Sequence, residues 1–217
     1  MISLDSAMLA HAGLRTTDLS FNVGDTVFER GAPAYFIYVV NTGALFRFRL
    51  LPGGRRSILQ FLFAGDGFGY EPGGSYRDTV QALTDSEVLA AGRQSLVAPS
   101  VSRRSVLFDA AARAFVVAEE QAVFIRGATA TERTALFLLE MDARISVDGQ
   151  IDLPMSRKDI SDYLGVCVET ISRALNEFRR AKIIEIPEHI PKRIVIRDKK
   201  RLEQLASDAS EFKWWKH

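Results

Sequence analysis

The chain has 217 residues, of which 47% are hydrophobic and 25% are charged, and its formal net charge is +1. This length is enough for one large domain or two modest ones, and a charge near zero gives no global sign of a nucleic-acid partner. The single cysteine excludes an intrachain disulfide and a cysteine-ligated cluster built within one chain. The first residues lack the basic start and apolar core of a signal peptide, and no apolar run approaches membrane-spanning length. We therefore expect a cytoplasmic protein with no membrane segment.

The first part of the chain has the spacing of short β-strands. Residues 1 to about 17 form a helical or irregular lead, and from Leu19 onwards short apolar runs are separated by glycine-containing turns. Many short strands at regular spacing predict a sandwich or small barrel. The clearest alternation lies between Phe46 and Leu50, where we expect the phenylalanines to face the core and the arginines to face solvent. The expected strands cover residues 26–28, 35–40, 44–50, 57–63, 79–82 and 87–90.

The pattern becomes helical after these strands. Between Ser105 and Arg126 a seam of residues recurs at steps of four and three, and its alanines let two helix backbones approach closely. This seam packs either on a second copy of the chain or on the strand domain of its own chain. A hinge at residues 127–130 separates it from a further helix, Thr131–Ile145. The seam consists of Leu107, Ala111, Ala114, Ala118, Gln121 and Ile125.

Residues 153–186 have the pattern of two helices joined by a tight turn and followed by a strand. Ser156 is expected to be the N-cap of the first helix, with a carboxylate at the third helical position. Gly165 lies where the turn needs a residue that can adopt positive φ. The second helix, about Val168 to Ala181, has an apolar inner face and a polar outer face. Its inner residues are Ile171, Ala174, Leu175 and Phe178, and its outer residues are Glu169, Thr170, Ser172, Arg173 and Asn176.

The remaining segments complete a winged helix-turn-helix. They are strands at 183–186 and 193–197, the loop at 187–192 between them and a last helix at 198–206. In the loop region, Lys192 and Arg193 either contact a phosphate or stay in solvent. The tail contains Trp214 and Trp215, and the sequence does not determine whether they pack on the domain.

The outer face of the second helix suits the major groove of DNA. Arg173 can donate two hydrogen bonds to guanine, Glu169 can accept one from cytosine, and Ser172 suits either kind of base edge. The N-terminal residues of a docked recognition helix lie at the bases, as these three do. The competing interpretation is a surface ion pair between Glu169 and Arg173, which are four residues apart. The turn geometry and a local excess of positive charge, twelve Lys/Arg against seven Asp/Glu in residues 156–201, favour DNA binding.

Three stretches of this motif resemble the CRP/FNR superfamily, and within it the FixK-like branch. They are residues 153–157 (LPMSR), 159–165 (DISDYLG) and 169–173 (ETISR). The last is similar to the Glu-x-x-Ser-Arg signature of recognition helices in that branch. The resemblance implies that Glu169, Ser172 and Arg173 read the bases of a TTGA-type half-site. It also implies that Ser156, Arg157 and Thr170 contact phosphates.

The resemblance extends to the strand region, which is similar to the β-roll sensor domain of the same superfamily. Residues 41–44, 54–58 and 65–71 carry it. Cyclic-nucleotide-binding members need a Gly-Glu pair for the ribose and an Arg-Ser pair for the phosphate. Here Tyr70 follows Gly69, and Arg77 is displaced by one residue, which on a strand turns a side chain to the other face. We therefore expect a filled β-roll with no cyclic nucleotide.

The family also implies the assembly and its partners. A long helix containing the seam would form a homodimer, and a two-fold dimer reads a palindrome whose half-sites are one helical turn apart. Activation through contact with RNA polymerase is implied, as is activity without a bound cofactor. The alternative is an effector-gated CRP-like regulator in which a small molecule enters the β-roll.

An enzyme of the cupin type has the same β-roll outline, but it lacks the necessary ligands here. Cupin metal sites combine several histidines with a carboxylate, whereas this chain has only His11, His189 and His217, none of them in the strand region. No Ser/His/Asp set or Cys/His pair is available either. We expect no enzyme, no metal and no cofactor.

Cys167 departs from the pattern of the branch, which has Thr or Ser at this position. A hydroxyl there would cap the recognition helix and meet a phosphate, whereas a thiol caps poorly. A helix N-terminus favours the thiolate and therefore oxidation. One hypothesis is that oxidation of Cys167 adds bulk and negative charge beside DNA and stops binding. The competing interpretation is a neutral substitution for Ser.

The sequence thus predicts an α+β protein with an N-terminal β-roll (a double-stranded β-helix similar to cyclic-nucleotide-binding domains), a long dimerisation helix and a C-terminal winged helix-turn-helix. The expected boundaries are 1–104, 105–127 and 128–217. The expected function is a transcription regulator that binds double-stranded DNA.

Overall fold

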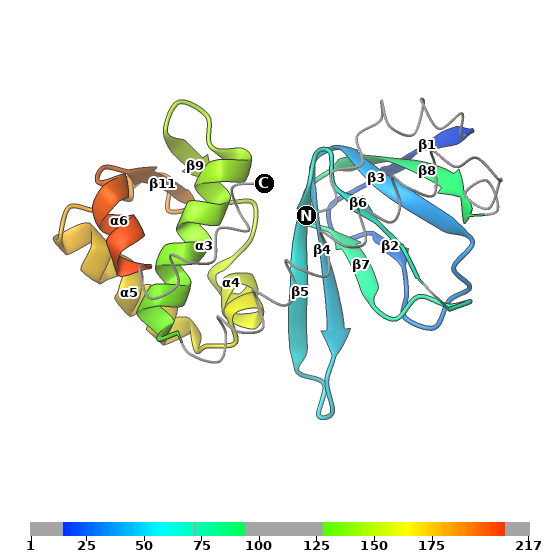
Figure 1. Cartoon of the computed structure of the whole chain (residues 1–217), viewed down its shortest axis with the longest axis horizontal. Helices are drawn as coiled ribbons and strands as arrows, with labels where there is room; N and C mark the ends of the chain where they lie inside the picture. The colour runs from blue at the N-terminus through cyan, green and yellow to red at the C-terminus, as the bar shows by residue number, and fades with distance from the viewer. Residues whose placement is uncertain (1–14, 72, 94–127, 207–217) are drawn as a thin grey trace. The chain divides into compact units, whose positions relative to one another are not determined.

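The computed structural model describes residues 15–71, 73–93 and 128–206, and the chain divides into two compact units, Met1–Phe115 and Val116–His217 (Figure 1). The predicted dimerisation seam, from Leu107 to Ile125, lies outside the described residues, as do Trp214 and Trp215. Each unit is described separately below. The predicted boundaries at 104 and 127 also fall outside the described residues and stay a prediction.

The described part of the N-terminal unit is built from two antiparallel four-stranded sheets. One has the strand order β1-β8-β3-β6 and the other β2-β7-β4-β5, so that strands distant in sequence are neighbours. This arrangement confirms the predicted β-roll. The strands are β1 Thr16–Phe21, β2 Thr26–Phe28, β3 Phe36–Thr42, β4 Ala44–Leu50, β5 Arg56–Phe63, β6 Gly67–Phe68, β7 Thr79–Ala82 and β8 Ser86–Gly92.

Aromatic rings fill part of the core of this unit. The ring centroids of Phe28 and Tyr76 are 3.7 Å apart and those of Tyr38 and Phe68 are 5.1 Å apart, with both pairs stacked. The Tyr76 hydroxyl donates to the Phe36 carbonyl at 2.8 Å, which satisfies its polar end. Aliphatic residues of both sheets, among them Leu45 on β4 and Val88 on β8, complete the same core.

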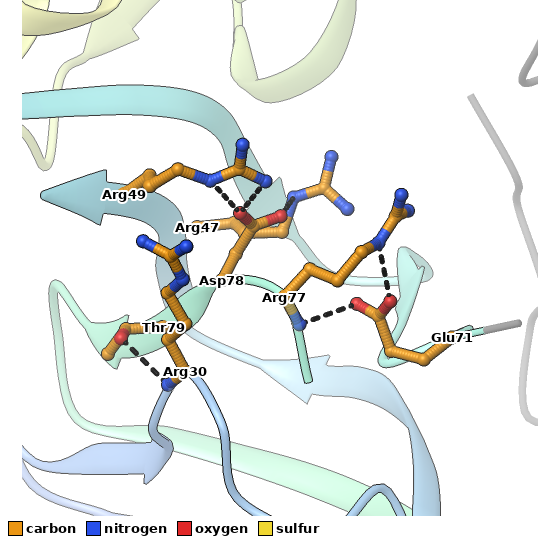
Figure 2. Close-up of polar contacts among 7 residues, drawn as sticks. All are labelled: Arg30, Arg47, Arg49, Glu71, Arg77, Asp78 and Thr79. Carbon is orange, nitrogen blue, oxygen red and sulfur yellow. Dashed lines mark hydrogen bonds and ion pairs between the residues drawn. The ribbon is translucent and has the colours of Figure 1, made fainter. Parts of the chain in front are cut away.

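The orientation predicted for β4 is wrong for its arginines. Arg47 and Arg49 share a face with Leu45, which is fully buried, and Arg47 pairs across the sheet with Val80 of the core. The reason is Asp78, only 5% exposed, whose carboxylate accepts from Arg49 Nη2 at 2.6 Å and lies 3.8 Å from Arg47 Nε (Figure 2). Two half-buried cations thus compensate a buried carboxylate, so this face of β4 is polar at one end.

The C-terminal unit contains four described helices and a three-stranded antiparallel sheet of order β10-β11-β9. Helix α3 packs on α5 and α6 (Figure 1), and its buried residues include the predicted Ala135, Leu136, Leu138, Leu139 and Met141. The elements are α3 Ala130–Ile145, β9 Gln150–Asp152, α4 Arg157–Leu164, α5 Val168–Arg180, β10 Ile184–Glu185, β11 Arg193–Ile196 and α6 Lys199–Leu205. This order confirms the winged helix-turn-helix.

Three short strands differ from the prediction. Strand β1 begins at Thr16, inside the segment expected to be a helical or irregular lead, because it pairs along its whole length with β8. Strands β6 and β9 have two and three residues and were not predicted. Both are defined by pairing with a distant partner, β3 and β11 respectively, and not by a local alternation.

Candidate nucleic-acid interface

The start of α4 is fixed by a capping box. The Asp159 amide donates to Ser156 Oγ at 3.1 Å, and the Ser156 amide donates to Asp159 Oδ2 at 2.8 Å. The Ser156 hydroxyl itself donates to the same carboxylate oxygen at 2.6 Å. The prediction of Ser156 as N-cap is therefore confirmed. Its hydroxyl and its amide both already donate to Asp159, so contact with a phosphate would require the hydroxyl to turn away from this carboxylate.

The turn between α4 and α5 depends on Gly165 and Arg133. Gly165 is the C-cap of α4 with φ 67° and ψ 32°, and its amide donates to the Ser161 carbonyl at 2.9 Å. Arg133, from α3, donates to the Leu164 carbonyl at 3.2 Å and to the Ala128 carbonyl at 3.0 Å. A cation at the C-terminal end of α4 also suits the helix dipole. Arg133 thus fixes the turn to the start of α3 through these hydrogen bonds. The sequence analysis did not identify this role.

A buried polar network joins α3 to α4. The Tyr163 hydroxyl donates to Glu140 Oε2 at 3.1 Å, and Arg144 Nη1 lies 3.4 Å from Glu140 Oε1. Burial, together with the neighbouring Glu140 carboxylate, raises the pKa of Tyr163 well above its usual range. The contact of Tyr163 was also missed from the sequence, because Tyr163 lies 23 residues from Glu140 and on another helix.

Helix α5 presents the polar face that its sequence predicted. Its four inner residues, Ile171, Ala174, Leu175 and Phe178, are all buried. On the outer face, Glu169, Arg173 and Asn176 are exposed, and Thr170 and Ser172 are half-buried. The helix therefore keeps its apolar side against the unit and leaves Glu169 and Arg173 open to a partner.

Glu169 and Arg173 do not neutralise each other in this structure. Within the described residues no ion pair joins them, although the i, i+4 pair of Lys158 and Asp162 on α4 does form. The surface-ion-pair interpretation is thus not what the structure shows. Both side chains are available for hydrogen bonds to a groove of DNA.

Arg157 and the wing loop are joined to each other. Arg157 Nη2 donates to the Pro191 carbonyl at 3.3 Å, while its Nη1 is buried with no hydrogen-bond acceptor among the described residues. Burial lowers the pKa of the Arg157 guanidinium. From the loop, Lys192 Nζ donates back to the Pro154 carbonyl at 3.1 Å. Arg157 therefore connects the wing loop to the start of α4 through a hydrogen bond, in addition to any contact that it makes with a phosphate.

Cys167 is the N-cap residue of α5, and it is exposed. Its backbone is extended, with φ −69° and ψ 149°, but its side chain makes no capping hydrogen bond. Its carbonyl still accepts from the Thr170 amide at 3.0 Å. The expectation that a thiol caps this helix poorly is confirmed.

The described residues lack two other kinds of feature. They contain no group of three or more His, Cys, Asp or Glu side chains arranged to hold a metal ion. Of the helices described, none combines the length and the apolar character needed to cross a membrane.

Both units match known domain families. Residues 132–205 match the Crp-like helix-turn-helix domain, and residues 18–98 match the cyclic nucleotide-binding domain. With the open face of α5, these matches define a transcription regulator that binds DNA through its C-terminal unit.

Similar proteins identify the family of transcription regulators to which the chain belongs. The chain is 34% identical to the nitrogen fixation regulation protein FixK of Bradyrhizobium diazoefficiens, over 94% of this chain and 88% of that protein. It is 30% identical to the transcriptional activatory protein AadR of Rhodopseudomonas palustris, over 84% of this chain and 78% of that protein. The solved structure of FixK2 from Bradyrhizobium japonicum superimposes with a TM-score of 0.84 at 38% identity, covering 88% of this chain and 98% of that one. The chain belongs to the FixK group of the CRP/FNR family.

Proposed function

We propose that this regulator binds a TTGA-type palindrome as a homodimer and activates transcription there without a bound effector. The open outer face of α5 is the observation on which this rests, because Glu169 and Arg173 are exposed and not paired with each other. In this proposal Glu169, Ser172 and Arg173 read base edges. Ser156, Arg157, Cys167 and Thr170 lie at the N-terminal ends of α4 and α5, where backbone amides favour phosphate. Such a protein acts in the cytoplasm, where the chromosome lies.

Two substitutions separate base reading by Arg173 from the general effect of a positive charge on α5. Arg173→Ala should cost about 1–3 kcal/mol on the cognate palindrome and relax the choice of base at the guanine. Arg180→Ala is the matched control, because Arg180 is also exposed and lies two turns further along the same helix. It should weaken binding to all sequences about equally and lower the dependence on salt. Equal losses on cognate and scrambled DNA for Arg173→Ala would refute direct readout.

Effector independence is tested by DNA binding with no ligand added. The purified protein should bind a TTGAT-NNNN-ATCAA duplex tightly and in a sequence-specific manner, at a stoichiometry of two chains per duplex. Absence of specific binding would refute effector independence and favour a regulator that needs an effector.

Relatives that are named as activators support activation by this protein. In this proposal activation proceeds through contact with RNA polymerase. Transcription from a promoter carrying the palindrome should rise when the protein is added to purified polymerase. DNA binding that is intact while transcription falls would instead support repression at that promoter.

Cys167 adds a redox component to this proposal. Its exposed thiol stands at the N-terminal end of the recognition helix, where an oxidised, negatively charged sulfur would face a phosphate. Peroxide should therefore weaken DNA binding of the wild type and not of Cys167→Ser. Equal losses in both proteins would leave Cys167 as a neutral substitution.

One observation favours the second candidate, an effector held in the β-roll. Arg47 Nε is buried with no hydrogen-bond acceptor among the described residues, and burial lowers the pKa of Arg47. Around it, Arg49 pairs with Asp78, and Arg77 Nε donates to Glu71 Oε2 at 2.8 Å (Figure 2). Three arginines therefore surround two carboxylates, and the excess positive charge suits a small anion.

The Arg77 side chain nevertheless lies on the other face of its segment, as its displacement by one residue predicted. Tyr76, Asp78 and Val80 are buried at alternate positions, whereas the Arg77 side chain between them is 65% exposed. An anionic effector should raise the melting temperature of the protein, and Arg47→Met should abolish this shift. No shift with any nucleotide or phosphate ester would leave the effector-independent regulator as the sole proposal.

A further inference from the structure

One outward residue of α5 has no part in the signature that implied the base-reading residues. Asn176 is exposed and lies in the middle of the helix, between the buried Leu175 and the exposed Glu177. Among the described residues its side chain forms no hydrogen bond or ion pair. Asparagine is also a poor helix former at such a position. Neither packing nor helix stability therefore explains why asparagine is at this position.

The direction of the side chain is set by the period of the helix. At about 100° per residue, Asn176 projects about 60° from Arg173 and about 20° from Glu169 around the axis. It projects about 40° from Ser172 by the same rotation. The buried residues, Ile171 and Leu175 among them, lie on the opposite side. Asn176 thus falls within the arc that the three base-reading residues span.

Its position along the axis fits a neighbouring base pair. Three residues of α-helix rise about 4.5 Å, whereas successive base pairs of B-DNA are about 3.4 Å apart. A residue one turn beyond Arg173 therefore reaches about one base pair further along the groove. Arg180, a turn further again, lies about 10 Å from Arg173 along the axis, where the backbone is the nearer contact.

The chemistry of the side chain identifies the base. A carboxamide has one acceptor and one donor group side by side, which matches the N6 donor and N7 acceptor of adenine in the major groove. We propose that Asn176 reads an adenine in the base pair next to the guanine that Arg173 reads, and so adds a fourth base-reading side chain to the half-site. This inference rests on the proposed function, because it requires α5 to lie in the major groove.

The test is a selection of bound duplexes from a library. The full-length protein is presented with palindromes in which every half-site position is randomised symmetrically, and bound DNA is sequenced for the wild type and for four variants, one of them Arg173→Ala. Asn176→Ala should lose the adenine preference at one position, on the order of tenfold, and keep the guanine preference. Asn176→Gln should retain adenine, since glutamine carries the same pair of groups. Glu177→Ala is the matched control and should select the wild-type site.

The outcomes separate this inference from the proposed function. If Arg173→Ala relaxes the guanine while Asn176→Ala selects the same site as the wild type, the role of Asn176 is overturned and the proposed function stands. If Arg173→Ala relaxes no position, or the wild type selects no palindrome, both are overturned. Because alanine is a better helix former than asparagine and the position is exposed, loss of folding is not expected. A thermal melt of each variant checks this.

Discussion

The turn between α4 and α5 allows a stability prediction that the structure makes unusually simple. Gly165 has φ 67°, and a Cβ added to it would meet nothing within 4 Å. Gly165→Ala therefore has no steric clash with a neighbour, and its cost is that of a left-handed backbone with a side chain, about 1–2 kcal/mol. Alanine also restricts the unfolded chain, which offsets about 0.4–1 kcal/mol of this. The net loss of unfolding free energy should be about 1 kcal/mol.

Gly149 is the matched control for this prediction. It lies in the same unit, has φ 74° and likewise has nothing within 4 Å of an added Cβ, but it is in the turn before β9 and not in the helix-turn-helix. Urea unfolding, followed by the helical circular dichroism signal, should give Gly149→Ala and Gly165→Ala similar losses. At a temperature where both are folded, their DNA affinities should match the wild type. A loss well above 3 kcal/mol for Gly165→Ala alone, or a loss of DNA binding without unfolding, would refute the reasoning.

Three further predictions follow from buried or capping groups. Asp78→Asn should lower the unfolding free energy of the β-roll by about 2 kcal/mol. This loss is smaller than the loss for a fully buried ion pair, because Arg49 is partly exposed. Urea unfolding of the β-roll measures the change in unfolding free energy. Because the pKa of Tyr163 is raised, the folded C-terminal unit holds this proton more tightly than the unfolded chain, so its stability should fall as pH rises above about 10. Tyr163→Phe should have a shallower fall in alkaline urea titrations, and an identical pH slope would contradict this. Cys167→Ser should raise the melting temperature slightly, because a hydroxyl caps the N-terminus of α5 better than a thiol; an unchanged or lower melting temperature would contradict the capping argument.

Features that depend on local periodicity could be predicted from the sequence. The inner face of α5, the N-cap at Ser156 and the turn at Gly165 each depend on residues within four positions of one another. Helical period and cap chemistry are properties of such short stretches. The outer face of the recognition helix, and with it the candidate base readers, followed directly from this local pattern.

Features that depend on distant partners could not be predicted. Alternation in β4 shows which residues share a face, but not which face is covered. The orientation of Arg47 and Arg49 is determined by Asp78, which is 29 residues from Arg49. In the same way, Arg133 meets the Leu164 carbonyl 31 residues away, and nothing in the sequence around either residue indicates that contact.

The structure also divides the predicted interface into two kinds of polar residue. Arg157 and Lys192 donate to the carbonyls of Pro191 and Pro154, so they hold the wing as well as adding charge. Arg173 and Arg180 on α5 are exposed. Arg157→Ala therefore removes a wing contact and a cation together, whereas Arg180→Ala removes only a cation. If Arg157 acts through the wing, its substitution should weaken binding more than Arg180→Ala does while changing the salt dependence by the same amount, about one phosphate contact. Equal affinities for the two variants would mean that the contact of Arg157 with the wing contributes nothing to DNA binding.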